Sequence, residues 1–340
     1  MAELALTAER RSELLALLDD EKRLRAEFPK VSNYLEMAPT LPGTGNLQVD
    51  AAFDLRFTHY VTGRRAVSAN PYWDIVAPFV NEHEGRQVVN GGNPEGSARF
   101  AYAQMLLQEI YAYAIPSPQT VEWVSSFCAG RQLVELGAGR GYWAEQLATG
   151  GVDVAAYDFE PPDKVDNASF SRAAGHSDVV WHHVGDLEEF EANKEGYGDA
   201  VLFLCWPPGW GNTMASEVLR AFEEAGGTRL IFIGQLKGGM TGDDAFFDAL
   251  SAGWRLESED PGFVSWWNLL EVAQGWCGAD QTKSGLNLRI SDSAQTALAV
   301  VQDSGVSFIL KANASYRSIG VRNIGNHHDA AVAGEIVLLN

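Results

Sequence analysis

The sequence is poor in cysteine, in positive charge and in long apolar runs. Its three cysteines are Cys128, Cys205 and Cys277. Their odd number and wide spacing argue against a disulfide framework or a paired-cysteine zinc site, and fit a reducing cytoplasm. No apolar run approaches the length of a membrane span, and the first residues show no basic segment followed by an apolar core. We therefore expect a soluble, globular, cytoplasmic protein with no membrane partner.

Positive charge is scarce as well. The 340 residues include 25 Lys and Arg against 45 Asp and Glu, which gives a formal net charge of −20. A field of that sign repels phosphate backbones, so nucleic acid is not expected as a substrate. The basic pair Arg64-Arg65 is too short to offset this field. A small molecule or a peptide is the expected substrate.

The segment 132–143 carries the clearest functional pattern: Gln-Leu-Val-Glu-Leu-Gly-Ala-Gly-Arg-Gly-Tyr-Trp. Its apolar residues predict a short buried strand, three glycines at alternate positions predict a turn, and a helix pattern starts at Trp143. A strand, a glycine turn and a helix in this order are typical of nucleotide-binding loops in doubly wound sheets. A dinucleotide fingerprint would place its third glycine at position 142, which is Tyr142 here.

Three further segments predict parallel strands. The first, 151–158, ends in Asp158, about 20 residues past the glycine turn, where such folds bind ribose hydroxyls. The second, 179–186, ends in Gly-Asp. The third, 199–205, is almost entirely apolar, as expected for a central strand, and leads into a Trp-Pro-Pro-Gly-Trp loop.

The G-x-G-x-G turn, with Glu135 two residues before its first glycine, resembles motif I of class I S-adenosylmethionine (SAM) methyltransferases. The resemblance covers residues 113–278 and implies a seven-stranded, Rossmann-like α/β sheet with SAM as cofactor. It implies that Glu135 takes the positive aminoacyl end, that Asp158 binds the ribose and that Asp186 binds the adenine amino group. Alternatively, Glu135 or Asp186 only caps a helix or a turn. The implied cofactor residues are Glu135, Gly137, Ala138, Gly139, Gly141, Trp143, Asp158, Phe159, Gly185, Asp186, Leu187 and Cys205.

The loop after the fourth strand resembles the (Asn/Asp/Ser)-Pro-Pro-aromatic motif of amino-group methyltransferases, whose first side chain holds a planar nitrogen. Trp206 stands at that first position, and an indole cannot accept a hydrogen bond. An aromatic or apolar substrate stacked on Trp206, or a cation–π contact to the sulfonium, fits this residue better. The alternative is a rigid turn with a packing Trp, and for the tyrosines ordinary helix packing. The predicted substrate residues are Trp206, Pro207, Pro208, Trp210, Tyr102 and Tyr113.

No residue stands out as a general base. His59, His83 and His183 are candidates by chemistry alone, and each could instead be satisfied within the fold. His182 and His183 alternate along a predicted strand, so at most one of them faces a cleft. We expect no metal site, because the adjacent histidines of His327-His328-Asp329 are a poor ligand pattern.

Three regions are predicted along the chain. A helical N-terminal cover spans 1–112, the SAM-binding methyltransferase region spans 113–278, and a β-rich appendage spans 279–340. The appendage could serve homodimer formation or could cover the substrate. Its short β-like runs lie at 286–290, 296–301, 306–310, 316–324 and 332–339.

Particular residues mark the ends of the expected helices and strands. The expected helices run from Thr7 to before Pro29, from Pro71, from Ser97 to about Ala112, from Met214 to Ala225, and onward from a cap at Thr241. The expected later strands are 228–234 and two closing strands that start at Trp254 and Trp267.

We therefore predict SAM-dependent methyl transfer to an oxygen or nitrogen of a small metabolite or peptide-like product. One alternative is an NAD-linked oxidoreductase on a similar sheet, from which Tyr142 at the third-glycine position distinguishes the chain. The other is a non-catalytic SAM-fold scaffold that binds a partner protein through its terminal additions. Trp206, in place of the usual polar residue, keeps this second alternative open.

Overall fold

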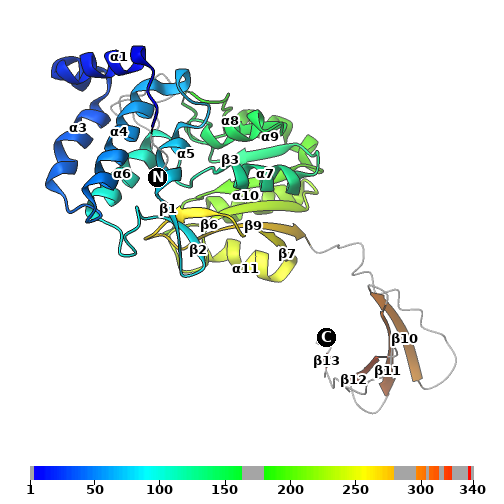
Figure 1. The fold of residues 1–340 in the computed structure, drawn as a ribbon. Helices are drawn as coiled ribbons and strands as arrows, with labels where there is room; N and C mark the ends of the chain where they lie inside the picture. The colour runs from blue at the N-terminus through cyan, green and yellow to red at the C-terminus, as the bar shows by residue number, and fades with distance from the viewer. Residues whose placement is uncertain are drawn as a thin grey trace. The chain divides into compact units, whose positions relative to one another are not determined.

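A computed structural model describes residues 4–162 and 180–278, together with the backbone of four strands between 296 and 337. The chain divides into two units, Met1–Ala279 and Asp280–Asn340. The first unit is a mixed α/β structure with N-terminal helices and a largely parallel sheet (Figure 1).

The N-terminal helices begin largely where the sequence predicts. The hydroxyl of Thr7 accepts from the Arg10 amide (3.1 Å), and Ser97 caps a later helix in the same way (3.1 Å to Phe100). The helix predicted before Pro29 is two helices, because Asp20 ends one and caps the next through the Arg23 amide. These helices are α1 (Ala8–Asp19), α2 (Glu21–Glu27), α3 (Pro29–Met37), α4 (Leu47–Gly63), α5 (Pro71–Val76) and α6 (Ala98–Ile110), with 3-10 turns at Ala38–Thr40, Arg64–Ala66 and Ala77–Phe79.

Among the described residues, the central sheet has six strands in the order β4-β3-β5-β6-β9-β7. The first four run parallel, and β9 is antiparallel to both of its neighbours. Strand β3 is buried along its whole length and β5 along all but its last residue, and apart from Glu135 their residues are apolar, as the sequence predicts for central parallel strands. The strands are β3 (Leu133–Leu136), β4 (Val154–Tyr157), β5 (Val201–Cys205), β6 (Arg229–Gln235), β7 (Trp254–Glu259) and β9 (Glu271–Gly278).

Helices connect the parallel strands and cover the sheet (Figure 1). The predicted helix from Met214 is present, whereas the predicted cap at Thr241 is wrong, because Asp243 accepts from the Phe246 amide (3.1 Å) and is the capping residue. The helices are α7 (Pro118–Cys128), α8 (Tyr142–Thr149), α9 (Leu187–Asn193), α10 (Met214–Glu224) and α11 (Asp244–Gly253), with a 3-10 turn at Lys194–Tyr197.

The strand predicted at 179–186, which would complete a seven-stranded sheet, is reduced to a single parallel bridge between Tyr157 and Gly185 in the part that the structure describes. The closing strand expected from Trp267 begins later, at Glu271. Residues just before Trp267 instead form β8 (Val264–Trp266), which joins β1 (Val80–His83) and β2 (Arg86–Val89) in a small second sheet. The sequence patterns do not predict this sheet, because β2 and β8 are far apart in the chain.

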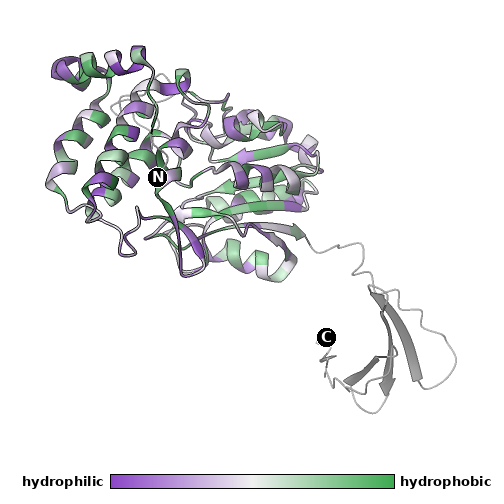
Figure 2. Ribbon diagram, viewed as in Figure 1, coloured by the Kyte–Doolittle hydropathy of each residue, from purple (hydrophilic) through white to green (hydrophobic). Residues whose placement is uncertain are grey.

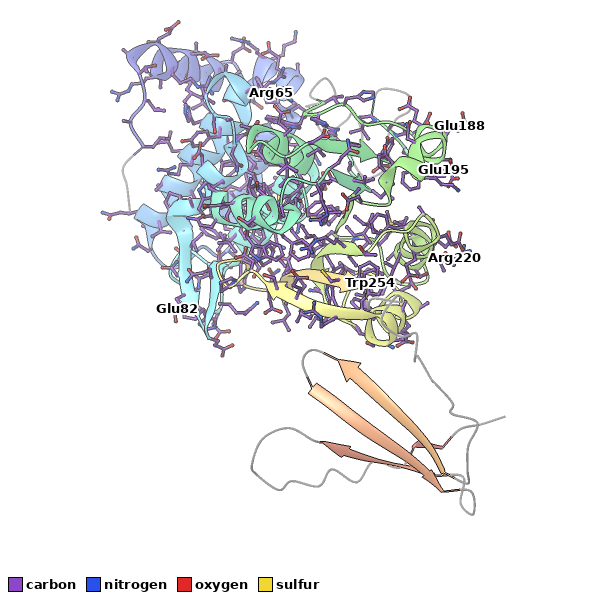
Figure 3. All side chains as sticks on the ribbon, turned by 90° about the vertical axis from the view of Figure 1, so that its right-hand side faces the viewer. Arg65, Glu82, Glu188, Glu195, Arg220 and Trp254 are labelled. Atoms are coloured by element: carbon purple, nitrogen blue, oxygen red, sulfur yellow. The ribbon has the colours of Figure 1, made fainter. Side chains whose placement is uncertain are left out.

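The N-terminal helices and one face of the central sheet share a hydrophobic core. That core joins Phe53 and Phe57 of α4 to Trp143 of α8 and Phe203 of β5. A second core, on the other face, lies beneath α10 and α11. Both hydrophilic and hydrophobic residues occur along α1 and α3 (Figure 2). Charged side chains such as Glu82, Glu188, Glu195 and Arg220 lie exposed at the surface (Figure 3).

The second unit contains an antiparallel sheet of consecutive strands. Three of its strands overlap the runs predicted at 296–301, 306–310 and 316–324, and the last falls within 332–339. The run predicted at 286–290 lies outside the described residues. The strands are β10 (Thr296–Asp303), β11 (Val306–Asn313), β12 (Ser318–Asn323) and β13 (Ile336–Val337).

Candidate functional site

The carboxyl ends of the parallel strands bring most of the predicted site to one edge of the sheet. The glycine turn follows β3, Asp158 follows β4 and Trp206 follows β5. Glu271, the first residue of β9, pairs with Gln235, the last residue of β6, so it reaches the same edge from the opposite direction. Ligands of open α/β sheets bind outside this edge.

The glycine turn depends on backbone conformations that favour glycine. Gly137, Gly139 and Gly141 have φ values of 83°, 56° and 71°. A side chain at Gly141 would also collide with His182, because an added Cβ would lie 2.9 Å from the His182 Cβ. The amide of Gly139 donates to Asp158 Oδ2 (2.8 Å), so this carboxylate holds the turn against the end of β4.

Glu135 is buried beneath the glycine turn with only 3% of its surface exposed. Its Oε2 atom has no hydrogen-bond partner. The pKa of its carboxyl is raised to about 8, chiefly by burial and also by the nearby Asp158 charge, against the lowering effect of a hydrogen bond from the Ala144 backbone. An acid held in this way gains from a cation placed against it, because the cation would favour the ionised form.

The other predicted cofactor residues divide between the surface and the core. Phe159 and Leu187 are exposed beside the strand ends, where a ligand can reach them. Asp186 caps α9 by accepting from the Glu189 amide (2.9 Å), which is the alternative considered for it. The prediction that Trp143 contacts the cofactor is wrong for this structure, because its ring is buried and its indole N–H donates to the Ala114 carbonyl (3.2 Å).

Ala138 and Gly185 contribute backbone rather than side chain at this edge. The amides of Gly137 and Ala138 both donate to the Tyr157 carbonyl, at 2.9 and 3.1 Å. The Gly185 amide donates to the Ala156 carbonyl (2.9 Å), and its own carbonyl accepts from Asp158 (3.0 Å). These bonds fix the start of the turn and the Asp158 backbone relative to each other.

Trp206 forms the wall of the site beyond β5. Its φ of 53° is in the left-handed region, which a non-glycine residue rarely adopts. The backbone N–H donates to the Ile233 carbonyl (2.8 Å), and the indole N–H donates to Glu271 Oε1. The ring stacks on Tyr113 with centroids 5.2 Å apart and planes 16° apart. The predicted neighbours Trp206 and Tyr113 are thus brought together.

Glu271 is a site residue that the sequence patterns do not indicate. It lies 65 residues from Trp206 in the chain, and no motif surrounds it. The side chain is 5% exposed, and burial raises the pKa of its carboxyl to about 8, against the lowering effects of the Trp206 hydrogen bond and the Arg86 charge.

Cys205 is electrostatically coupled to both buried acids. Burial raises the pKa of its thiol well above the usual value, and the negative charges of Glu135 and Glu271 raise it further. The thiol therefore stays protonated at neutral pH and is a poor nucleophile.

The Trp-Pro-Pro-Gly-Trp loop is held against the loop that precedes α11. The Gly242 amide donates to the Pro207 carbonyl (2.9 Å), and Pro208 forms a backbone bridge with Thr241. Gly209 has no room for a side chain, because an added Cβ would lie 2.7 Å from the Met240 carbonyl oxygen. Trp210, at the end of this loop, is 82% exposed.

Asp243 fastens the two helices beside this loop. Its Oδ1 accepts from the Phe246 amide at the start of α11 (3.1 Å), and its Oδ2 accepts from the Ser216 amide at the start of α10 (3.1 Å). Both helices that follow the strand ends of the wall are therefore tied to one carboxylate.

Tyr142, at the third-glycine position, joins the glycine turn to the N-terminal helices. Its hydroxyl donates to Asn70 Oδ1 (2.9 Å) and accepts from the Tyr72 amide (3.1 Å). The ring is fully enclosed by aromatic neighbours, including Trp181 at 4.9 Å between centroids. The Tyr142 side chain therefore anchors α8 to the N-terminal helices. A dinucleotide-binding turn would have glycine, which has no side chain, at this position.

Two of the residues predicted for the site lie elsewhere. His59 is buried on α4, where its Nδ1 accepts from Arg10 (3.2 Å), and burial with the charges of Arg10 and Arg56 lowers its pKa to about 4. The prediction of His59 as a base at the site is therefore wrong. Tyr102, predicted as a substrate residue, stacks on Tyr34 in the helical layer (6.3 Å between centroids), which fits the alternative of ordinary helix packing.

Apart from His59, the histidines that the structure describes in the first unit are exposed or only partly buried. His83 ends β1 in the small second sheet, where it pairs with Arg86. His183 is exposed, with Nε2 3.9 Å from Glu189, and His182 Nδ1 lies 3.9 Å from Glu145. His182 lies against the glycine turn through its backbone and Cβ. His327-His328-Asp329 lie outside the described residues.

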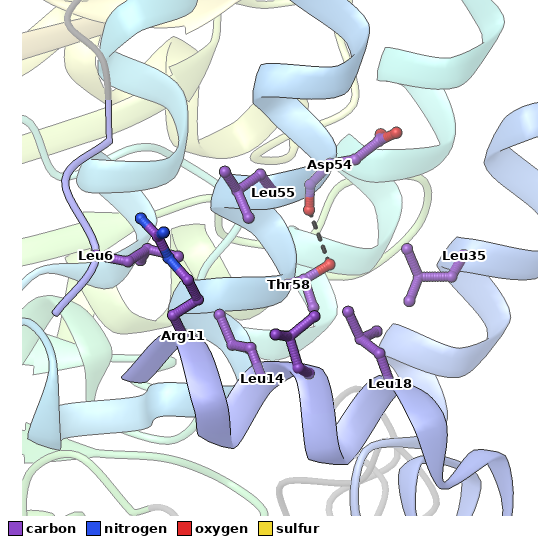
Figure 4. Close-up of a pocket in the computed structure, with 9 residues that line it drawn as sticks. Leu6, Arg11, Leu14, Leu18, Leu35, Asp54, Leu55 and Thr58 are labelled. Atoms are coloured by element: carbon purple, nitrogen blue, oxygen red, sulfur yellow. Dashed lines mark hydrogen bonds between the residues drawn. The ribbon is translucent and has the colours of Figure 1, made fainter. Parts of the chain in front are cut away.

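A hollow of about 260 Å³ lies between α1, α3 and α4 (Figure 4). Leucines dominate its lining, and none of the predicted site residues borders it. Within 4–162 and 180–278, no cluster of three or more His, Cys, Asp or Glu residues is arranged to hold a metal. No helix in the described part of the chain is both long and apolar enough to cross a membrane.

Known proteins match the chain only among solved structures, at low identity and low TM-score. No family model and no curated protein matches the sequence. Solved structures do match, and among them is magnesium protoporphyrin IX methyltransferase from Synechocystis PCC 6803, with 13% identity and a TM-score of 0.29 over 47% of this chain and 79% of that one.

Two further matches come from Streptomyces. N,N-8-amino-8-demethyl-D-riboflavin dimethyltransferase from Streptomyces davawensis has 15% identity and a TM-score of 0.30 over 81% of this chain and 100% of that one. A methyltransferase from Streptomyces caelestis has 15% identity and a TM-score of 0.23 over 61% and 73%. All three are methyltransferases by name. At these identities and TM-scores, the three matches do not indicate a substrate for this chain.

Proposed function

We propose that the protein is a class I SAM-dependent methyltransferase that acts on an oxygen or nitrogen of a small molecule. The observation that carries this proposal is the buried Glu135 carboxyl, which lies under a left-handed glycine turn with one oxygen unpartnered. A cationic group at this edge would satisfy that oxygen, and the α-ammonium group at the aminoacyl end of SAM is such a cation. The pyrophosphate of a dinucleotide such as NAD would instead bring negative charge next to this buried acid.

The residues at the strand ends fit the rest of a SAM molecule. The glycines allow the backbone to approach a ligand closely, and Asp158 carries carboxylate oxygens suited to ribose hydroxyls. Phe159 and Leu187 are exposed apolar groups suited to the faces of adenine. Since Asp186 caps α9, we assign the adenine contacts to these two residues rather than to its carboxylate.

When bound, SAM supplies a methyl group on a sulfonium, which an acceptor lone pair can displace. The contribution of the protein to such a displacement is mainly alignment. Trp206 and Tyr113 provide a wall at the end of β5, and the protonated Cys205 thiol does not compete for the methyl group. We assign no general base.

Calorimetry with S-adenosylhomocysteine and the full chain tests the proposal. We expect measurable heat for the wild type, and an affinity about ten- to hundredfold lower for Glu135→Gln, because a charge-assisted contact is lost. The matched control is Glu195→Gln, an exposed acid of the same type, which should bind like the wild type. Absence of heat in the wild type, or a rise in melting temperature with NAD alone, would contradict the proposal and favour the oxidoreductase alternative.

A further inference from the structure

We infer that Trp206 and Tyr113 form an aromatic platform that selects a planar aromatic methyl acceptor, and that Glu271 is the positioning residue for this platform. The aromatic platform consists of these two rings. That its ligand accepts a methyl group rests on the proposed function, whereas its binding preference can be measured without any methyl transfer.

The platform is built at a conformational cost. Trp206 has a φ of 53°, and Trp210 in the same loop has a φ of 51°. Left-handed non-glycine residues persist only where surrounding contacts hold them, and they concentrate at functional sites. At Trp206 those contacts are the backbone bond to Ile233, the indole bond to Glu271 and the Tyr113 ring.

The geometry of the pair determines where a ligand can lie. With planes 16° apart and centroids 5.2 Å apart, the two rings are already in offset stacking contact. A third ring cannot enter between them, so it would have to extend the stack from outside the pair. Tyr113 is 40% exposed, so part of its side chain is accessible to such a ring. A flat, conjugated ligand matches such a surface better than a puckered ring of the same size.

Two large apolar side chains on strand-end loops of the same sheet edge are exposed. Trp210 follows β5 and is 82% exposed, and Leu236 follows β6 and is 46% exposed. Such side chains gain by contact with an apolar ligand, because that contact removes them from water. They therefore favour an apolar ligand over a charged one at this edge of the sheet.

Glu271 acts on the platform through Trp206. An indole has a single hydrogen-bond donor and no acceptor, so one partner fixes the rotation of the ring. Glu271 supplies that partner from the start of β9 and is itself 5% exposed, so it is covered by protein. Without it, the half-buried indole would lose its only fixed polar contact and could turn away from Tyr113.

Two alcohols of matching size test the selectivity. The full chain is first saturated with S-adenosylhomocysteine and then titrated in a calorimeter with 2-naphthol or with decahydro-2-naphthol. We expect 2-naphthol to bind about fivefold more tightly, since aromatic contacts add to the energy of area burial. Tyr113→Leu should abolish the preference, whereas Tyr102→Leu, an aromatic substitution in the helical layer, should preserve it. Equal affinities in the wild type, or loss of preference in the Tyr102 control only, would overturn the inference.

A double-mutant cycle tests the role of Glu271. Glu271→Leu should abolish the preference, and Glu271→Gln should keep it, because an amide oxygen still accepts from the indole. Phe has no N–H, so in a Trp206→Phe background Glu271→Leu should change the preference by less than about twofold. If Glu271→Leu keeps the preference, or lowers it equally in both backgrounds, Glu271 does not act through the indole.

The failure of this inference differs from the failure of the proposed function. If S-adenosylhomocysteine gives no heat but the naphthol preference persists in the ligand-free chain, the methyltransferase proposal falls and the aromatic platform stands. If S-adenosylhomocysteine binds and the two alcohols do not differ, the platform falls and the cofactor site stands.

Discussion

Glu135 and Glu271 are both buried acids at one edge of the sheet, and burial raises the pKa of each carboxyl to about 8. They differ in their partners. Glu271 accepts from the indole of Trp206, whereas one oxygen of Glu135 has no partner. Glu271 is therefore used by the fold itself. Glu135 costs the fold free energy and is understandable as a group that a ligand completes.

The largest effect expected from this comparison is on stability. Glu271→Leu should lower the free energy of unfolding by about 1–3 kcal/mol, because it leaves the Trp206 indole without its acceptor. Glu135→Leu should lower it by less, because the loss of the hydrogen bond from the Ala144 backbone is partly offset by the removal of an unpartnered buried oxygen. Urea unfolding of the full chain, followed by tryptophan fluorescence, measures both. Equal losses of unfolding free energy in the two variants would contradict the proposed difference between the two acids.

The next effect is on the pH dependence of ligand affinity. The carboxyl of Glu135, with its pKa raised to about 8, is mostly protonated at pH 7 in the free protein, and a cationic ligand requires the ionised form. Binding of S-adenosylhomocysteine should therefore release a proton, and affinity should rise by about tenfold per pH unit from pH 6 toward 8. The nearby Asp158 and Cys205 also face this site, so Glu135→Gln is the control that should flatten the slope. Calorimetry in two buffers of different ionisation enthalpy counts the protons.

The smallest effect concerns the connection to the N-terminal helices. Tyr142→Phe removes the hydroxyl that links α8 to Asn70 and to the Tyr72 amide, and should cost about 1 kcal/mol of stability. Binding of S-adenosylhomocysteine should stay within about twofold of the wild type, because the ring and the glycine turn remain. Thermal unfolding with and without the ligand measures both quantities. A large loss of affinity with unchanged stability would place Tyr142 in the ligand site instead.

The predictable part of the site is the part that is local in sequence. The glycine turn, Glu135 and Asp158 follow strands that are recognisable from their apolar residues, and the Pro-Pro loop follows β5 directly. The stacking of Tyr113 on Trp206 was not predicted, because it depends on how the segment between α6 and α7 packs against the loop after β5.

The part that could not be predicted depends on long-range pairing. Glu271 reaches the edge because β9 runs antiparallel to β6, and Trp266 joins a sheet with Val89, far earlier in the chain. The error at His59 has the same origin, because only the packing of α1 on α4 places Arg10 beside it. Trp143 was assigned to the ligand by its position after the turn, whereas the helix directs its ring into the core.

The starts of two helices beside the Trp-Pro-Pro-Gly-Trp loop depend on one residue, Asp243. One carboxylate holds the first turns of α10 and α11, and both of its oxygens accept from backbone amides of these helices. The loop that carries Trp206 is attached next to these helix starts, because the Gly242 amide donates to the Pro207 carbonyl and Pro208 forms a backbone bridge with Thr241. A substitution of Asp243 would therefore disturb the starts of two helices at once, directly beside this loop.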